Sequence, residues 1–426
     1  MIYHLFQWFE KMGWDFPGAN LMNYISFRSA VCIILALINV FWIGPKVIRW
    51  LQKKQIGEEI RDLGLEGQLA KKGTPTMGGI IILPSILVPV LLFCNLTSIY
   101  VLLLIFTTVC LGAIGFKDDS IKVFKKNKEG MKEKSKIFGQ LAVGLVVGIT
   151  LLASPQNVIR LYSENPHSGG KSEVVEGVGD KKVIYYRDVK SRTTTIPFLK
   201  HNEFKYSWLA PGEGRFRDWA TNVIYVILIT FIVIAVSNGT NLTDGMDGLA
   251  SGTSAIVGVT IAILAYLSGN AIFADYLSIM YIPNTGEIVI FMAAFVGALI
   301  GFLWYNTYPA QIFMGDTGSL AIGGIIGVAA IMIRKELMIP LLCGIFFMES
   351  LSVLIQRYYF KYTKKKTGEG VRVFRMSPLH HHFQKENPDA IIQWPHHVTP
   401  EAKITVHFWI VTIILGILTV ITLKIR

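Results

Sequence analysis

The sequence of 426 residues has few charged side chains: Asp, Glu, Lys and Arg make up 16% of it, whereas hydrophobic residues make up 52%. Such an apolar composition excludes an ordinary soluble domain. The apolar residues form long blocks and lack the 3.6-residue periodicity of an amphipathic helix. A helix needs about 20 mostly apolar residues to cross the hydrocarbon layer. The composition therefore predicts a protein that crosses a membrane several times.

Three common signals are also missing. Glu10, Lys11 and Asp15 interrupt the apolar stretch at the N-terminus, so we expect no cleavable signal peptide. The four cysteines lie in apolar segments without metal-ligand spacing, which favours a packing role. No G-x-x-x-x-G-K-[ST] sequence is present, which excludes a Walker loop.

About ten apolar segments have the length of a membrane-spanning helix, and polar loops with Gly and Pro separate them. The segments are Tyr24–Ile48, Met77–Asn95, Ser98–Phe116, Ile137–Ser154, Trp219–Ser237, Leu249–Ser268, Glu287–Tyr305, Ser319–Ile333, Met338–Phe360 and Val406–Leu423. Helices satisfy their own backbone hydrogen bonds in lipid. We therefore expect an all-α polytopic fold in a single membrane domain over residues 1–426. Both termini are expected outside, with a long extracytoplasmic insertion at about 155–218.

The formal net charge of +12 would suit a nucleic-acid-binding protein, but its distribution favours a membrane. The basic residues cluster in three loops, at 46–72, 117–136 and 361–403, which an alternating topology places on one side. The positive-inside rule makes that side cytoplasmic. Anionic lipid headgroups and a phosphorylated substrate account for the charge, so we expect membrane lipids and no nucleic acid as partners.

Every Gly-rich or acidic motif lies in one of five loops that this topology places in the cytoplasm. The loops are Arg49–Thr76, Lys117–Lys136, Asn238–Gly248, Asn306–Gly318 and Lys361–Thr405. The longest outer connection, Pro155–Asp218, has a β-prone stretch at Lys182–Val189 and is expected to be a solvated insertion without a catalytic role. A site on one face suits a soluble cytoplasmic substrate that meets a membrane-embedded one.

Two adjacent carboxylates, Asp118 and Asp119, lie at the cytoplasmic C-terminal end of the third apolar segment. The helix dipole disfavours negative charge there, so the pair needs a compensating cation. The neighbouring lysines are one candidate. Mg²⁺ is the other, because it prefers hard oxygen ligands together with a substrate phosphate. Asp316, in Gly-Asp-Thr-Gly-Ser, is a natural third carboxylate for such an ion.

The stretch 237–248 contains two Asn, two Asp and three Gly between two apolar segments. Helix capping by Thr243 or Asp244 is the simpler interpretation, but it would need only one or two of these side chains. Segments that start in the cytoplasm, at Thr76, Asp244 and Asp316, have Gly-rich and hydroxyl-bearing N-termini. Helix N-termini favour phosphate, so we expect a diphosphate to lie across them.

Three consecutive histidines, His380, His381 and His382, lie in the last cytoplasmic loop. They cannot share one helix face, so a transition-metal site would need partners from elsewhere. Phosphate contact or proton transfer is the alternative. Glu349 is an acid inside the ninth segment, for which we expect a polar partner in the bundle and no place in the site. Phe313 offers a π-face to a nucleobase or serves as an interfacial anchor.

Five motifs together resemble the phospho-N-acetylmuramoyl-pentapeptide-transferases, in the polyprenyl-phosphate N-acetylhexosamine-1-phosphate transferase superfamily. The motifs are Gly73-Thr74-Pro75-Thr76-Met77-Gly78-Gly79, Asp118-Asp119, Asn238–Gly248, Gly315-Asp316-Thr317-Gly318-Ser319 and His380-His381-His382, in the order and spacing of that family. The resemblance implies a Mg²⁺-dependent enzyme of the bacterial inner membrane. It implies transfer of phospho-MurNAc-pentapeptide from UDP-MurNAc-pentapeptide to undecaprenyl phosphate, with release of UMP, in the first membrane step of peptidoglycan synthesis. A homodimer is also implied.

The resemblance assigns roles to individual residues. The implied catalytic residues are Asp118, Asp119, Asp316, His380, His381 and His382, and the three aspartates are the implied metal ligands. The implied substrate-binding residues are Lys72, Thr76, Lys122, Lys126, Lys134, Asn238, Asn241, Asp244, Gly245, Met246, Asp247, Asn306 and Phe313. Among the lysines, Lys72 and Lys134 match the family's phosphate-facing positions best.

The sequence departs from the family pattern at three places. Lys117 stands where a small or apolar residue is commoner, Gln384 stands where Glu usually follows the histidines, and the insertion 155–218 exceeds the usual length. The nearest alternative function is a sister transferase that loads GlcNAc-1-phosphate onto the same lipid, and it usually differs at the histidines. An alternative from another class is a secondary transporter, whose ionisable groups would lie near the bilayer midplane.

Overall fold

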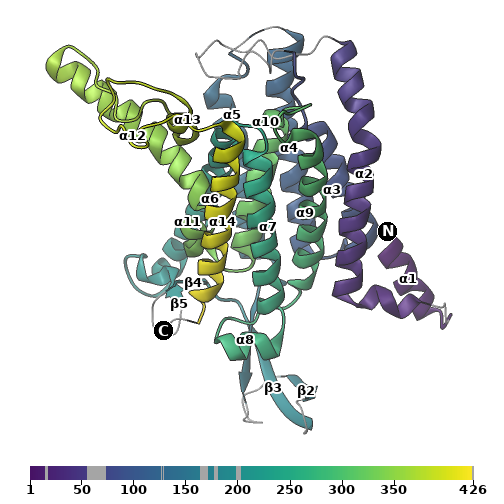
Figure 1. Ribbon diagram of the computed structural model, residues 1–426. Helices are drawn as coiled ribbons and strands as arrows, with labels where there is room; N and C mark the ends of the chain where they lie inside the picture. The colour runs from purple at the N-terminus through teal and green to yellow at the C-terminus, as the bar shows by residue number, and fades with distance from the viewer. Residues whose placement is uncertain are drawn as a thin grey trace.

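The computed structural model describes residues 1–14, 18–54, 73–125, 127, 129–163, 171–176, 181–197 and 203–424, and most of these residues are helical (Figure 1). The predicted segments correspond to α2 (Ile25–Lys53), α3 (Gly79–Phe93), α4 (Ile99–Phe124), α5 (Glu133–Ala153), α6 (Gly214–Thr243), α7 (Leu249–Ser268), α9 (Gly286–Asn306), α10 (Gly315–Met332), the pair α11 (Ile339–Leu342) and α12 (Gly344–Thr367), and α14 (Glu401–Ile421). Short helices α1 (Ile2–Lys11), η1 (Ala19–Asn23), α8 (Ala271–Leu277) and α13 (Leu379–Gln384) lie between or before them.

The helices confirm a polytopic membrane protein. Within the described residues, eight helices are long and apolar enough to cross a membrane. The pair α11 and α12, which meet at an angle of 78°, makes a ninth if the two helices form one broken span. The remaining predicted segment, Met77–Asn95, contains α3, which has 15 helical residues and is shorter than a full span. Its helix begins after Met77, whose φ is +80°, and ends at Cys94, whose backbone is extended.

Two helices continue further than their apolar segments. α4 runs to Phe124, so Asp118 and Asp119 lie inside the helix and not after it. α6 runs to Thr243, so Asn238 and Asn241 lie on its last turns, and the predicted loop at 238–248 shrinks to a tight turn. These extensions place the polar motifs on rigid helical backbone.

The helix α10 is the centre of the bundle, because every residue from Asp316 to Met332 is buried. It packs between α4 and α6. A Cβ atom at Gly323 would lie 2.6 Å from Val236 O of α6, and one at Gly324 would lie 2.1 Å from Leu111 Cδ1 of α4. Glycine therefore allows the close approach that small residues give to helices in lipid.

The insertion between α5 and α6 forms small sheets at the end of the bundle where the C-terminus also lies (Figure 1). The strands β1 (Ile159–Ser163), β3 (Lys181–Val189) and β2 (Lys171–Glu176) form an antiparallel sheet in that spatial order, with Tyr162 opposite Tyr186. β4 (Thr193–Thr195) pairs with β5 (Glu203–Lys205), and η4 (Tyr206–Trp208) follows. The strand predicted at Lys182–Val189 is confirmed as β3.

The expectation of a solvated insertion is wrong at β4, whose three residues are buried and which packs against the segment just after α10. Arg334, 1% exposed, donates through Nη1 to Ser191 O at 2.7 Å and through Nη2 to Asn157 Oδ1 at 3.1 Å. Lys335 Nζ donates to Thr195 Oγ1 at 2.7 Å, in front of η5 (Glu336–Met338). Buried charges need such partners, so the bundle and the insertion share one polar core here.

Candidate active site

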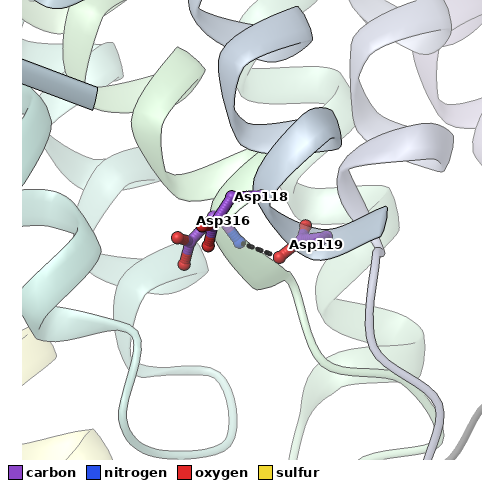
Figure 2. Close-up of side chains that lie close together, drawn as sticks. All are labelled: Asp118, Asp119 and Asp316. Carbon is purple, nitrogen blue, oxygen red and sulfur yellow. Dashed lines mark hydrogen bonds between the residues drawn. The ribbon is translucent and has the colours of Figure 1, made fainter. Parts of the chain in front are cut away.

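Three aspartates meet at the end of the bundle opposite the β-strands (Figures 1 and 2). Asp118 and Asp119 come from α4 and are 0% and 2% exposed, and Asp316 comes from the first turn of α10. One ligand oxygen from each lies within 4.8 Å of the others. Gly115 makes this possible, because a Cβ atom there would lie 2.1 Å from Asp316 O. Within the described residues, this is the one cluster of three or more potential metal-binding His, Cys, Asp or Glu side chains.

Asp119 caps the helix that carries Asp316. Its Oδ1 accepts a hydrogen bond from Asp316 N at 3.1 Å, which Figure 2 shows as a dashed line. Its Oδ2 accepts bonds from Thr317 N at 2.8 Å and Thr317 Oγ1 at 2.5 Å. A helix leaves its first N–H groups without intrahelical partners, and Asp119 satisfies two of them from a neighbouring helix. Both of its carboxylate oxygens therefore face α10.

Asp118 and Asp316 face two lysines instead. Asp118 Oδ2 lies 2.7 Å from Lys122 Nζ and 2.8 Å from Lys136 Nζ. Asp316 Oδ2 lies 3.3 Å and 2.6 Å from the same two ammonium groups. The two lysines thus supply compensating positive charge for Asp118 and Asp316. Because cationic groups already bridge the two carboxylates, the oxygen donors also fit a Mg²⁺ ion, which prefers such hard ligands.

Lys136 is a residue that the sequence motifs did not single out. It lies in the first turn of α5, two residues after Lys134, which is exposed and points elsewhere on the helix. Residues two apart on a helix do not share a face. Lys72 and Lys126, which the resemblance assigned to the substrate, lie outside the described residues. The sequence could have predicted the position of Lys136 from the helical periodicity of α5, because Lys136 lies one turn before the buried Gln140.

Asn241 and Thr76 border the carboxylates. Asn241 Nδ2 donates to Asp316 Oδ1 at 2.9 Å and to Ser319 Oγ at 2.8 Å, which orients the Asp316 side chain. The segment around Thr76 is hydrogen-bonded to the segment before Asp316: Phe313 N donates to Pro75 O, and Gly78 N donates to Phe313 O, both at 2.8 Å. Phe313 is half-buried beside this pairing.

Four of the predicted substrate-binding residues have partners within the protein. Asn238 Nδ2 donates to Gln140 Oε1 of α5 at 2.8 Å. Met246 is buried in a small apolar cluster. Asp247 Oδ2 accepts from Ala310 N at 3.0 Å, and Asn306 Oδ1 accepts from Gly248 N at 3.2 Å. These contacts fix the turn between α6 and α7, which presents Asp244 and the exposed Gly245 at the surface.

The three histidines point in three directions. His382 Nδ1 accepts from Arg375 N at 3.1 Å, so its Nε2 carries the proton and donates to Trp394 O at 2.8 Å. Burial lowers the pKa of His382, which favours this neutral form. His381 Nδ1 lies 2.9 Å from Gln384 Oε1. His380 is completely buried, with Nδ1 3.1 Å from Glu349 Oε2. Glu349 therefore has the polar partner expected for an intramembrane acid.

Comparisons with known proteins agree with these motifs. The model of glycosyl transferase family 4 matches residues 101–334, and signature 1 of phospho-N-acetylmuramoyl-pentapeptide-transferase matches residues 71–83. The chain is 55% identical to the phospho-N-acetylmuramoyl-pentapeptide-transferase of Parabacteroides distasonis. It is 54% identical to those of Porphyromonas gingivalis and Flavobacterium psychrophilum. Each of these alignments covers 100% of both chains.

Proposed function

Because this chain belongs to the phospho-N-acetylmuramoyl-pentapeptide-transferase family, we propose that it transfers phospho-MurNAc-pentapeptide from UDP-MurNAc-pentapeptide to undecaprenyl phosphate and releases UMP. The observation that carries the proposal is the pair Asp118 and Asp316, bridged by Lys122 and Lys136 at the cytoplasmic end of α4 and α10. Phosphoryl transfer depends mainly on positioning and on neutralising phosphate charge. A cluster of carboxylates and ammonium groups suits both tasks.

Asp118 and Asp316 are the residues that would hold Mg²⁺. When bound, Mg²⁺ neutralises the diphosphate and stabilises the departing UMP. Lys122 Nζ contacts both carboxylates, and so does Lys136 Nζ, which keeps both positive charges where phosphate oxygens arrive. Asp119 serves as a positioning residue, because it holds the backbone of Asp316.

The chemical step needs little base catalysis. A phosphate monoester has a second pKa of about 6, so undecaprenyl phosphate is mostly a dianion near neutral pH. One of its oxygens attacks the phosphorus of the sugar phosphate, the bond from that phosphorus to the UMP oxygen breaks, and UMP leaves with the electron pair. Asn241 keeps Asp316 oriented during this step through its bond to Oδ1.

The setting proposed for this reaction is the bacterial inner membrane, with residues 1–426 as one domain. Exposed apolar side chains on α2, such as Ile34, Ile38 and Trp42, suit contact with lipid tails. A homodimer is part of the proposal and rests on the resemblance alone. Cross-linking in native membranes, which would give a species of twice the mass, tests it.

The first experiment measures UMP release by purified protein in detergent with UDP-MurNAc-pentapeptide, undecaprenyl phosphate and Mg²⁺. We expect lipid-dependent UMP that EDTA and Asp316→Asn abolish. Asp275→Asn, on the exposed outer helix α8, is the matched control and should keep the wild-type rate. Turnover with UDP-GlcNAc in place of the muramoyl donor would assign the chain to the sister transferase. No turnover with either donor by folded protein would overturn the proposal.

A further inference from the structure

The N-terminal half of α14 holds the turn between α6 and α7 through three side chains on one face of the helix. Glu401 Oε1 accepts a hydrogen bond from Asp247 N at 2.8 Å. Thr405 Oγ1 donates to Asp247 O at 3.1 Å, and Trp409 Nε1 donates to Gly248 O at 3.2 Å. Residues four apart lie on the same face of a helix. This face of α14 therefore fixes the backbone of the turn.

The carboxylate of Glu401 also faces the histidine motif. Gln384 Nε2 donates to Glu401 Oε2 at 3.5 Å, and Gln384 Oε1 lies 2.9 Å from His381 Nδ1. A carboxylate only accepts hydrogen bonds, so Glu401 orients the amide with its nitrogen toward α14 and its oxygen toward His381. The amide oxygen is an acceptor too, so the neutral His381 ring carries its proton on Nδ1 and has a lone pair on Nε2. Glu401 thus determines the tautomer of His381 through one intervening side chain.

This chain of hydrogen bonds lies at the end of the bundle that carries the aspartates, where α13 and the start of α14 are found (Figure 1). The ring centroid of His381 lies 4.2 Å from that of His380. The His380 ring lies against the turn between α6 and α7, because a Cβ atom at Gly245 would lie 2.3 Å from His380 Nε2. The last turns of α6 carry Asn241, which donates to Asp316 Oδ1. Glu401 is therefore linked to the site both through the histidines and through the turn.

We propose that Glu401 and Gln384 are positioning residues of the transferase. Glu401 holds the turn at Asp247 N and, through Gln384, keeps the ring proton of His381 on Nδ1. The proposal rests on the function proposed above and adds two residues that lie outside the five sequence motifs. It also explains the amide at position 384, because a side chain between a carboxylate and an N–H group must donate at one end and accept at the other.

The test exchanges the two side chains. In Glu401→Gln, the new amide oxygen can accept from Asp247 N, but the new amide nitrogen faces the Gln384 nitrogen. Gln384 must then rotate and offer its nitrogen to His381 Nδ1, which moves the ring proton to Nε2. In Gln384→Glu, two carboxylates face each other, which is unfavourable. We expect each substitution to lower kcat for UMP release by about tenfold, a size typical of coupling between contacting side chains.

The double variant, Glu401→Gln with Gln384→Glu, restores every hydrogen bond in the chain. The amide at position 401 accepts from Asp247 N and donates to the carboxylate at position 384, which accepts from His381 Nδ1. We expect its kcat to return to within about threefold of the wild-type value, whereas independent effects would multiply to a loss of about 100-fold. Rates are compared per amount of folded protein and at the pH optimum of each variant, because the carboxylate at position 384 faces the His381 ring.

The matched control is Lys403→Gln, which changes a charge on the exposed side of the first turn of α14 and should keep the wild-type kcat. Two outcomes overturn the inference while the proposed function stands. One is a Glu401→Gln variant with the wild-type kcat, and the other is a double variant no more active than Glu401→Gln. An inactive wild-type protein would instead remove the proposed function itself, so the two failures are distinguishable.

Discussion

Asp119→Ala removes the cap of α10, and its effect follows from three hydrogen bonds. The substitution leaves Asp316 N, Thr317 N and Thr317 Oγ1 without their acceptor in a site where Asp119 is 2% exposed. Hydrogen bonds to a charged group contribute about 1.5–3 kcal/mol each, and loss of a helix cap costs about 1–2 kcal/mol. The three bonds share one carboxylate and are not additive. We expect a destabilisation of about 3–5 kcal/mol.

The assay is thermal unfolding of purified protein in detergent, with EDTA and with Mg²⁺. A cap acts with or without metal, so the midpoint of Asp119→Ala should fall in EDTA. Mg²⁺ should still raise the midpoint of this variant, because Asp118 and Asp316 remain. Asp316→Asn should behave in the opposite way, with a smaller loss in EDTA and no response to Mg²⁺.

One result would refute this reasoning. If Asp119→Ala keeps the wild-type midpoint in EDTA and loses the response to Mg²⁺, then Asp119 is a metal ligand and its bonds to α10 contribute little. Asp119→Asn serves as the intermediate variant. Its amide oxygen retains one acceptor, so its loss in EDTA should be smaller than that of alanine.

Three further predictions concern other contacts. Lys136→Met should lower kcat for UMP release by about 10²-fold, because it removes a charge held at the phosphate position, whereas Lys132→Met, exposed at the same end of α5, should not. Gly115→Ala places a Cβ atom 2.1 Å from Asp316 O, so the free energy of unfolding should fall by at least about 1–3 kcal/mol. The thermal midpoint and the rate of UMP release should fall together. Arg334→Met breaks the buried bonds to Ser191 O and Asn157 Oδ1, and unfolding should show a loss of about 3–5 kcal/mol with an unchanged KM for the donor. Wild-type stability of Gly115→Ala or of Arg334→Met would contradict the role given to the corresponding contact. A wild-type kcat of Lys136→Met would contradict the role given to the lysine.

The sequence by itself determined the membrane architecture, because a helix in lipid requires a long apolar segment that can be counted directly. It also singled out Asp118, Asp119 and Asp316, since carboxylates at the ends of apolar segments need a cation, and the structure brings these three side chains together. Segment ends were less well predicted: α3 is shorter than its apolar segment, and α6 continues through the polar residues to Thr243. Hydropathy predicts which residues lie in lipid, but it does not predict the residue at which the helical hydrogen bonds end.

Only the tertiary structure decided which side chains meet. Asp119 caps α10 through a contact between residues 198 positions apart, and the helical phase of α5 places Lys136 against Asp118 and Asp316. Glu349 of α12 accepts a hydrogen bond from the backbone of His380 because α13 packs against α12. The physical reason is common to all three contacts: each depends on the rotation and approach of separate helices, which the packing of the whole bundle sets.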